Sequence, residues 1–363
     1  HTYRGVRSPN GDNYQSRKLY SVSKQVIAII CGGPSSEHEV SCVSAGGVLK
    51  GLDSERFDPV LIGITKSGTW VLLPIDYQLE IVDKKMPVIQ DNGQHVELSS
   101  SGFSIGGELL DVDCVFPVLH GEFGEDGKIQ QMLDEADLAY VGSGVSASVQ
   151  AMDKAVAKLL FASSGMKVAD GLDVNEQDWQ SKTGSLSYPV FVKPSSGGSS
   201  RGTHKVKSEA GLDSAIKDAF LYDNKVLIES AVNGREIECA VLERDGKVDA
   251  SVVGEIIINP KFEFYDFEAK YLDDATTVRI PANIPHADAE EIRRLAVAAF
   301  HVLGCSGLAR CDFFYTNDGE IIINEVNTMP GFTGTSVYPK LWQASGVSYT
   351  ELISALIDTA LSS

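Results

Sequence analysis

The 363-residue sequence has no apolar run long enough to span a bilayer and no pattern of a secretory signal. Positive charge is also scarce, because 31 Lys and Arg residues stand against 50 Asp and Glu residues and leave a net charge of −19. Phosphate backbones and anionic membranes require clustered cations. We therefore expect no nucleic-acid partner and no membrane insertion, although local lysines and arginines can still hold a small anionic ligand.

Signals for cysteine pairing are missing as well. The six cysteines are scattered, mostly within apolar runs, and no CxxC motif occurs. A structural disulfide is the alternative, but this spacing favours buried free thiols in a reducing compartment, which predicts a cytoplasmic protein. Residues 1–22 are polar and aperiodic, and we interpret them as a tag remnant or a disordered extension.

Two nucleotide-binding signatures are absent, namely GxGxxG and the Walker motif that ends in GK[ST]. The chain instead alternates helical runs with apolar runs, which include residues 26–30, 57–64 and 112–119. This alternation predicts an open parallel sheet, whose ligands lie at the carboxyl ends of its strands. Glu37 and His120 follow two such ends. A carboxylate at position 37 could hold an ammonium group, but it also suits a helix start, and a lone histidine is more often structural.

The chain is organised around residues 308–334, where two apolar runs flank Asp318-Gly319, a strong hairpin signal. Counting outward from this turn predicts four opposed pairs, which are Asn317–Glu320, Phe314–Ile323, Asp312–Glu325 and Arg310–Asn327. Opposed carboxylates ~5 Å apart repel each other, and a divalent cation would remove that conflict. The oxygen ligands of Asp312, Glu325 and Asn327 favour Mg²⁺ or Mn²⁺. A solvated hairpin face is the alternative.

The segment 195–202 is rich in glycine and serine and lies between two strand-like runs. Glycines allow close backbone approach and the hydroxyls can donate hydrogen bonds, so the segment predicts a flap over a triphosphate. Lys193 just ahead of it favours a flap over an exposed hairpin loop. The predicted helix 146–161 carries Lys154 and Lys158, and we interpret Lys158 as part of a solvated face.

Two later segments complete the candidate site. A strand ending at Glu229, a short hinge and a strand starting at Glu236 are typical of an adenosine slot between two lobes. The aromatic and charged segment 260–279 predicts a functional lid, with an ordered surface loop as the alternative. It offers Lys270 and Tyr271 as candidate active-site residues.

Seven motifs occur in the order and spacing of D-alanine–D-alanine ligases of the ATP-grasp superfamily, over about residues 24–361: GGPSSEHEVS (32–41), LHGEFGEDG (119–127), AMDK (151–154), FVKPSSGGSSRG (191–202), FYDFEAKY (264–271), ARCDF (309–313) and NEVNTMPG (324–331). The chain therefore resembles that family. The resemblance implies an α/β protein with an N-terminal open parallel sheet domain (23–143). A two-lobed ATP-grasp part of α+β type follows, with lobes at 144–232 and 233–363.

The resemblance also implies an activity. ATP phosphorylates the carboxylate of a first D-alanine, and the amine of a second D-alanine attacks the acyl phosphate. The products are ADP, phosphate and the dipeptide used for peptidoglycan precursors. Two Mg²⁺ or Mn²⁺ ions and a homodimer are expected on the same basis. Tyr271 favours an amine over D-lactate as the second nucleophile, because members that make the depsipeptide usually lack this tyrosine.

Residue roles are carried over from the family. The catalytic residues implied are Glu37, His120, Ser199, Tyr271, Arg310 and Ser336. Those implied to bind ATP are Lys154, Lys193, Glu229, Ser230, Val232, Glu236, Lys270 and Asn324. Substrate contacts are implied for Glu37, His120, Gly331, Ser336 and Val337, and metal ligation for Asp312, Glu325 and Asn327. Ser230 and Val337 depart from the residues common in the family.

Two alternatives stay open. The first is another ATP-grasp ligase with different carboxylate and amine partners, because the motifs from 191 to 331 are shared across the superfamily. The motifs at 32–41 and 119–127, together with Tyr271, favour the dipeptide ligase. The second is a non-catalytic nucleotide-binding module, which the presence of Arg310 and the metal ligands argues against.

Overall fold

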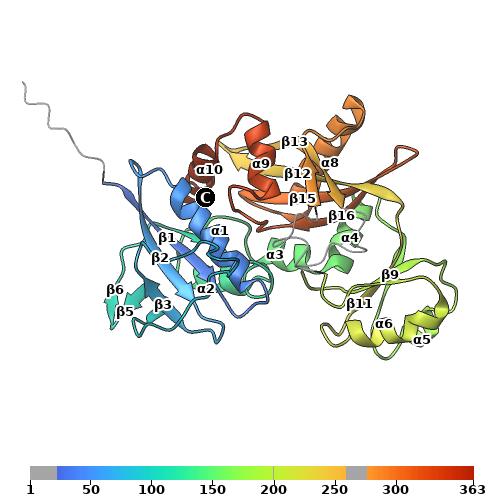
Figure 1. The fold of residues 1–363 in the computed structure, drawn as a ribbon, viewed down its shortest axis with the longest axis horizontal. Coiled ribbons are helices and arrows are strands. Elements are labelled where there is room, and N and C mark those ends of the chain that lie inside the picture. The colour runs from blue at the N-terminus through green and yellow to red at the C-terminus, as the bar shows by residue number, and fades with distance from the viewer. Residues whose placement is uncertain (1–22, 199, 259–275) are drawn as a thin grey trace, which may run out of the picture.

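The computed structural model describes residues 23–198, 200–258 and 276–363. The predictions for Ser199, Lys270 and Tyr271 lie outside the described residues. Within the described ranges the strands form four sheets. In Figure 1 the N-terminal sheet lies at the left, the sheet that contains β9 and β11 lies at the right, and the sheet from β12 to β16 lies above and between them.

The N-terminal sheet has the strand order β3, β2, β1, β7, with the bounds Trp70–Leu73, Phe57–Ile64, Gln25–Gly32 and Cys114–Pro117. β1 pairs in parallel with β2 and β7, as predicted, while the edge strand β3 runs antiparallel to β2. The helices that follow β1 and β7 are α1 (His38–Gly51) and α2 (Lys128–Glu135). Because β1 and β7 are parallel, Glu37 and His120 come from the same edge of the sheet.

A small antiparallel sheet consists of β4 (Val96–Ser99), β5 (Gly102–Ile105) and β6 (Glu108–Leu109). A larger one has the order β10, β9, β11, β8, with the bounds His204–Val206, Val190–Pro194, Val226–Ser230 and Gly171–Val174. Near it lie α5 (Trp179–Lys182), η1 (Glu209–Gly211) and α6 (Leu212–Ala219), whose apolar face is buried. Ser208 does not cap α6, because its side chain makes no capping hydrogen bond and the 3₁₀ turn η1 precedes the helix.

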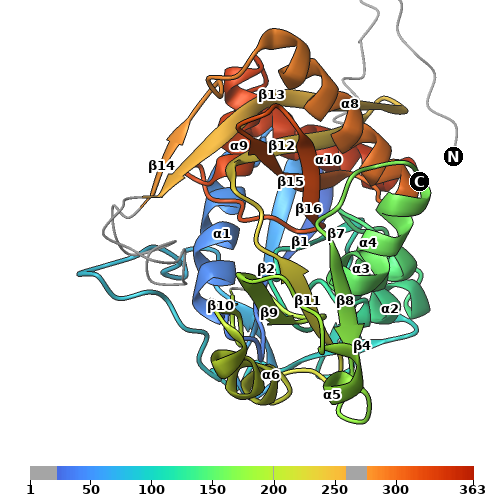
Figure 2. The same ribbon diagram turned by 90° about the vertical axis from the view of Figure 1, so that its right-hand side faces the viewer.

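The C-terminal sheet is antiparallel and has the order β14, β13, β12, β15, β16, with the bounds Thr276–Arg279, Lys247–Ile258, Gly234–Arg244, Leu308–Thr316 and Ile321–Asn327. Side chains alternate along β12, so Cys239 and Val241 share a core with α8 (His286–Leu303). Ala240 and Leu242 face the opposite way, toward α9 (Val337–Ala344) and α10 (Tyr349–Leu361). Figure 2 shows α8 and the pair α9 and α10 around this sheet.

The predicted continuous helix at 146–161 is wrong, because the chain forms two helices that meet at Asp153. They are α3 (Val145–Met152) and α4 (Lys154–Ser163). Asp153 has an extended ψ of 95°, and its carboxylate accepts a hydrogen bond of 3.2 Å from Val156 N, which caps α4. Gly165, with φ 82°, ends this region in the left-handed conformation that favours glycine after a helix.

In the hairpin between β15 and β16 the predicted pairing next to the turn is wrong, whereas the predicted pairs of functional residues are confirmed. Thr316, rather than Asn317, faces Glu320, since Thr316 N bonds to Glu320 O at 3.0 Å. Phe314 consequently pairs with Ile322 instead of Ile323. The register then shifts at a bulge where Asn324 is the extra residue. Asp312 therefore still faces Glu325, and Arg310 still faces Asn327, as predicted.

One hydrophobic core joins the N-terminal sheet to the C-terminal helices. Phe332 lies at its centre, with ring centroids 5.7 Å from Phe116, 5.7 Å from Tyr338 and 5.8 Å from Tyr349. All six cysteines are free, and all except Cys305 are buried, which confirms the predicted free thiols. In the described part of the chain, no helix is long and apolar enough to cross a membrane.

Candidate active site

A cavity of about 600 Å³ lies where the three larger sheets meet. Its lining combines the start of α1, the segment after β7, the start of α4, and strands β9, β11, β12, β15 and β16. Most of the predicted site residues within the described ranges line it, namely Glu37, His120, Lys154, Lys193, Glu229, Ser230, Val232, Glu236, Arg310, Asp312, Asn324, Glu325, Asn327 and Gly331. The described residues that line the cavity do not include Ser336 or Val337.

Arg310 is held in one orientation by a carboxylate on its own strand, β15, and by another on the neighbouring strand β12. Its Nε and Nη2 donate to Asp312 Oδ1 and Oδ2 at 2.7 and 2.6 Å, and its Nε lies 3.1 Å from Glu238 Oε2. Burial opposes the charged guanidinium, but the charges of Asp312 and Glu238 outweigh it and raise the pKa of Arg310. Glu238 was not predicted, although its place two residues after Glu236 puts both on one face of β12.

The predicted metal ligands lie together and have the chemistry of a hard-cation site. Asp312 faces Glu325 across the hairpin, and Asn327 Nδ2 donates to Asp312 Oδ2 at 3.1 Å. Lys154 Nζ lies 3.5 Å from Glu325 Oε2, so cationic side chains already accompany both carboxylates. Among the described residues no group of three or more His, Cys, Asp or Glu side chains forms a metal site. The predicted set differs from such a group, because it consists of two carboxylates and an amide.

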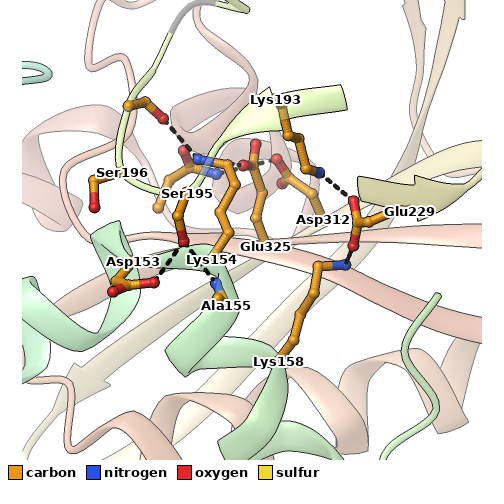
Figure 3. A network of polar contacts seen from close by, with 12 residues as sticks. Asp153, Lys154, Ala155, Lys158, Lys193, Ser195, Ser196, Glu229, Asp312 and Glu325 are labelled. Carbon is orange, nitrogen blue, oxygen red and sulfur yellow. Dashed lines mark hydrogen bonds and ion pairs between the residues drawn. The ribbon is translucent and has the colours of Figure 1, made fainter. Parts of the chain in front are cut away.

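Two lysines from different elements, α4 and β9, line the cavity. Lys154 begins α4, and its Nζ donates to Gly197 O at 2.6 Å. Lys193 extends from β9, and its Nζ lies 2.5 Å from Glu229 Oε2. The helix breaks at Asp153, and the backbone of Lys154 bonds instead to the Gly/Ser segment, with Lys154 N 2.9 Å from Ser195 O. This contact places Lys154 beside that segment. Figure 3 shows both lysines beside the carboxylates of the hairpin.

Lys158 is not part of a solvated face, which corrects the interpretation made from its sequence. Its side chain is 7% exposed and forms an ion pair with Glu229 Oε1. Burial lowers the pKa of Lys158 despite this partner. Burial also opposes the charge of Glu229, but Lys193 and Lys158 outweigh it and lower the pKa of Glu229. The i, i+4 spacing from Lys154 was the signal that Lys158 belongs to the same side of the helix.

Glu37 lies at the start of α1, where its side chain is buried. A Cβ atom at Gly121 would come within 2.6 Å of Glu37 Oε2, and one at Gly198 within 3.3 Å. Both glycines therefore leave room for this carboxylate, and Gly198 belongs to the Gly/Ser segment. Glu39 lies in the first turn of α1 and pairs with Lys66 at 2.5 Å.

His120 connects the end of β7 to the loop after β16. Its Nδ1 lies 2.9 Å from Met329 O, which can only accept a hydrogen bond, so Nδ1 carries the proton. Nε2 then accepts from Ser44 Oγ at 2.9 Å, and that hydroxyl accepts from Phe332 N at 3.3 Å. This chain of bonds fixes the loop that contains Gly331. Ser44 was missed, because no sequence signal relates a serine inside α1 to a loop near residue 330.

Glu125, like Glu238 and Ser44, was not predicted to belong to the site. Its Oε2 accepts from Gly121 N at 2.7 Å and its Oε1 from Met329 N at 3.3 Å. Burial, reinforced by the charge of Glu37, raises the pKa of Glu125 to about 7. It lies in the GEDG sequence of the 119–127 motif, which was the available signal.

The segment 333–337 closes the same loop. Ser336 Oγ accepts from Thr333 N at 3.1 Å, and a Cβ atom at Gly331 would lie 3.2 Å from Ser336 Oγ. Ser336 precedes α9, and Val337 is the first residue of that helix. Ser336 is thus beside Gly331, although neither Ser336 nor Val337 is in the lining of the cavity among the described residues.

The fold and its cavity define the ATP-grasp class of ATP-dependent ligases, as two solved structures show. The D-Ala:D-Ser ligase VanG from Enterococcus faecalis superposes with a TM-score of 0.82 at 35% identity, covering 93% of this chain and 99% of that chain. The D-alanine-D-alanine ligase from Coxiella burnetii gives 0.79 at 31% identity, covering 93% and 94%.

Sequence comparison gives the family. A model of the N-terminus of D-ala D-ala ligase matches residues 26–143, and a model of its C-terminus matches residues 160–358. The D-alanine–D-alanine ligase of Mycobacterium leprae is 47% identical over 92% of this chain and 93% of that protein. The ligase of Arthrobacter sp. strain FB24 is 46% identical over 93% and 94%. The chain belongs to the D-alanine–D-alanine ligase family, which confirms the predicted resemblance.

Proposed function

We propose that this protein joins two D-alanine molecules to D-alanyl-D-alanine, with ATP converted to ADP and phosphate, for peptidoglycan synthesis. The observation that carries this proposal is the match of both ligase family models over most of the chain. The cavity supports it, because one continuous lining contains carboxylates suited to an ammonium group, lysines suited to phosphates, and the Arg310 hairpin.

In this proposal the nucleotide lies between β9, β11 and β16. Lys154 and Lys193 bind phosphate oxygens, and Lys270 would act near the γ-phosphate. Glu229, Ser230, Val232, Glu236 and Asn324 surround the adenosine. Asp312, Glu325 and Asn327 would hold two Mg²⁺ or Mn²⁺ ions, which would supply positive charge to balance the phosphates. The donor set of two carboxylates and an amide fits such ions.

The first D-alanine lies on the Glu37 side of the cavity. Glu37 holds its ammonium group with the help of Ser199 and Tyr271, and His120 lies beside its carboxylate. Arg310 is fixed and fully charged, so it can stabilise the oxyanion of the tetrahedral intermediate together with Gly331 N–H. Ser336 and Val337 bind the carboxylate of the second D-alanine. The amine of that molecule attacks the acyl phosphate, and phosphate leaves.

We also propose a cytoplasmic homodimer with three structural regions, at 23–143, 144–232 and 233–363, preceded by a terminal extension. The free, buried thiols support a reducing compartment.

The decisive assay follows ADP release with ATP and Mg²⁺ over a panel of amino acids. We expect release with D-alanine alone and none with L-alanine. A mixture of D-alanine with D-serine or D-lactate identifies the second substrate by the mass of the product. ADP release that depends on an L-amino acid, or mainly on D-lactate at neutral pH, would contradict the proposal.

A further inference from the structure

The carboxylate of Glu229 forms ion pairs with two lysines, of which only one lines the cavity. Figure 3 shows Lys193 and Lys158 reaching its carboxylate from opposite sides. Lys193 Nζ lies 2.5 Å from Oε2, and Lys158 Nζ pairs with Oε1. The described residues that line the cavity include Lys193 and Glu229 but not Lys158. Lys158 therefore lies behind the carboxylate, and Lys193 lies in front of it.

The burial of the three side chains makes the distinction sharper. Lys158 and Glu229 are 7% and 5% exposed, while Lys193 is 13% exposed. Among the described residues, Lys158 Nζ and Glu229 Oε1 make no hydrogen bond besides their ion pair. Lys158 thus has one ion-pair partner among the described residues and does not line the cavity, whereas Lys193 does.

Few other charges act on Glu229. From α4 it faces Lys158, and from β9 it faces Lys193. The neighbouring strand β8 brings the backbone of Gly171 against it, which adds no charge. Glu325 on β16 acts through its charge on Lys158 and forms an ion pair with Lys154. The ionisation of Glu229 consequently depends on the two lysines.

We propose that Lys158 is a positioning residue that stays paired with Glu229 while Lys193 changes partner from Glu229 to the phosphates of the nucleotide. The proposal rests on the proposed function only in taking ATP as the ligand. A buried carboxylate that loses all its counter-ions must take up a proton, or else it opposes the loss of the last counter-ion. Lys158 keeps Glu229 ionised and lets Lys193 leave. Glu229 Oε2 is then available to accept a hydrogen bond from the nucleoside.

The test compares the wild-type protein with Lys158→Met, which keeps the length of the side chain and removes its charge. Binding of a non-hydrolysable ATP analogue with Mg²⁺ is measured by titration calorimetry in buffers of different ionisation enthalpy. In Lys158→Met we expect uptake of up to about one proton per nucleotide and a dissociation constant raised at least about tenfold. Because a proton is taken up, the affinity of this variant falls as pH rises. We expect no such uptake in the wild type.

Three further variants separate positioning from a general structural effect. Lys158→Arg keeps the charge and should bind like the wild type. The double variant Lys158→Met with Glu229→Gln has no carboxylate to protonate, so its binding should be free of proton uptake even if the single variant does not fold. Lys167→Met is the matched control, because Lys167 pairs with Glu320 on the surface, away from Glu229.

Equal proton uptake in the wild type and in Lys158→Met would overturn the proposal, as would proton uptake in the double variant. ADP release with D-alanine is assayed in the same wild-type preparation. If ADP release fails while the ATP analogue binds, the ligase assignment is wrong and the result for Lys158 still stands.

Discussion

Glu125 is the residue whose protonation the fold controls most visibly. Burial and Glu37 raise its pKa from 4.5 to about 7. A carboxyl group with a raised pKa is favoured in its protonated form by folding, so its contribution to the free energy of unfolding is largest at low pH. That contribution is lost as pH rises from about 4 to about 7.

We expect Glu125→Gln to remove this dependence, since a neutral amide imitates the protonated carboxyl group. The melting temperature of the variant minus that of the wild type should increase between pH 5 and pH 8. Thermal unfolding by circular dichroism at several pH values measures it. Glu122→Gln is the control, because Glu122 is exposed in the same segment. A difference independent of pH would show that Glu125 is ionised throughout.

Glu325 supplies the residue-scale test of the metal assignment. Glu325→Gln removes a charge from the proposed ion site, and changes to the partners of metal ligands alone typically cost 10–100-fold in affinity. We expect the Mg²⁺ concentration for half-maximal ADP release to rise at least about tenfold. Glu320→Gln on the same hairpin is the control. Full activity of Glu325→Gln at unchanged Mg²⁺ would remove Glu325 from the site.

Sequence motifs predicted the residues of the cavity better than the contacts among them. A family motif or strand pairing indicated Glu37, His120 and the hairpin residues, and all of them line the cavity. Lys158, in contrast, was interpreted as solvated. Its ion pair with Glu229 joins residues 71 positions apart, and no local pattern encodes such a distance.

At the scale of elements, the predicted register of the hairpin of β15 and β16 was wrong in two ways that cancel each other. A loop longer by one residue shifts the pairing near the turn, and the bulge at Asn324 shifts it back. Turn preference alone could not predict either feature, because Asp-Gly suits both two-residue and longer loops. The bulge lies between the turn and the metal-ligand pairs, so the functional register is kept while Asn324 enters the cavity lining.

The break between α3 and α4 gives the prediction at this scale. Asp153 caps α4 through Val156 N, accepts from Ser195 Oγ at 2.6 Å and pairs with Lys225 at 2.6 Å. Asp153→Asn keeps the cap and loses the charge, while Asp153→Ala loses both. We expect Asp153→Ala to lower the free energy of unfolding by about 1–2 kcal/mol from the cap, and more than Asp153→Asn does.

Urea unfolding measures these stabilities, and the Michaelis constant for ATP reports on the Gly/Ser segment that Ser195 begins. Asp213→Ala is the control, since Asp213 forms an exposed pair with Lys217 on α6. Equal stability of Asp153→Ala and Asp153→Asn would mean that the cap contributes nothing and that the charge alone matters.

At the scale of the molecule, the site exists because segments far apart in the chain meet. His120, which follows β7 of the N-terminal sheet, bonds to Met329 O, which follows β16 of the C-terminal sheet. The two residues are 209 positions apart in the sequence. The individual sheets were predictable from strand patterns, and the fold class follows from the family motifs. The packing of the first sheet on α9 and α10 was not predictable. Apolar residues in a sequence indicate that a surface is buried, but they do not indicate which other surface covers it.

Phe332 is where that packing can be tested. Its ring contacts Phe116 from the first sheet and Tyr338 and Tyr349 from the C-terminal helices. Phe332→Ala should lower the free energy of unfolding by about 3–5 kcal/mol through the cavity it leaves. Leu159→Ala, at a side chain that is 70% exposed, should change it by less than about 0.5 kcal/mol. Because one core joins the two parts, we expect calorimetry to show a single unfolding transition, shifted to lower temperature in Phe332→Ala. Two transitions, with only one of them shifted, would show that the N-terminal sheet unfolds independently of the C-terminal helices.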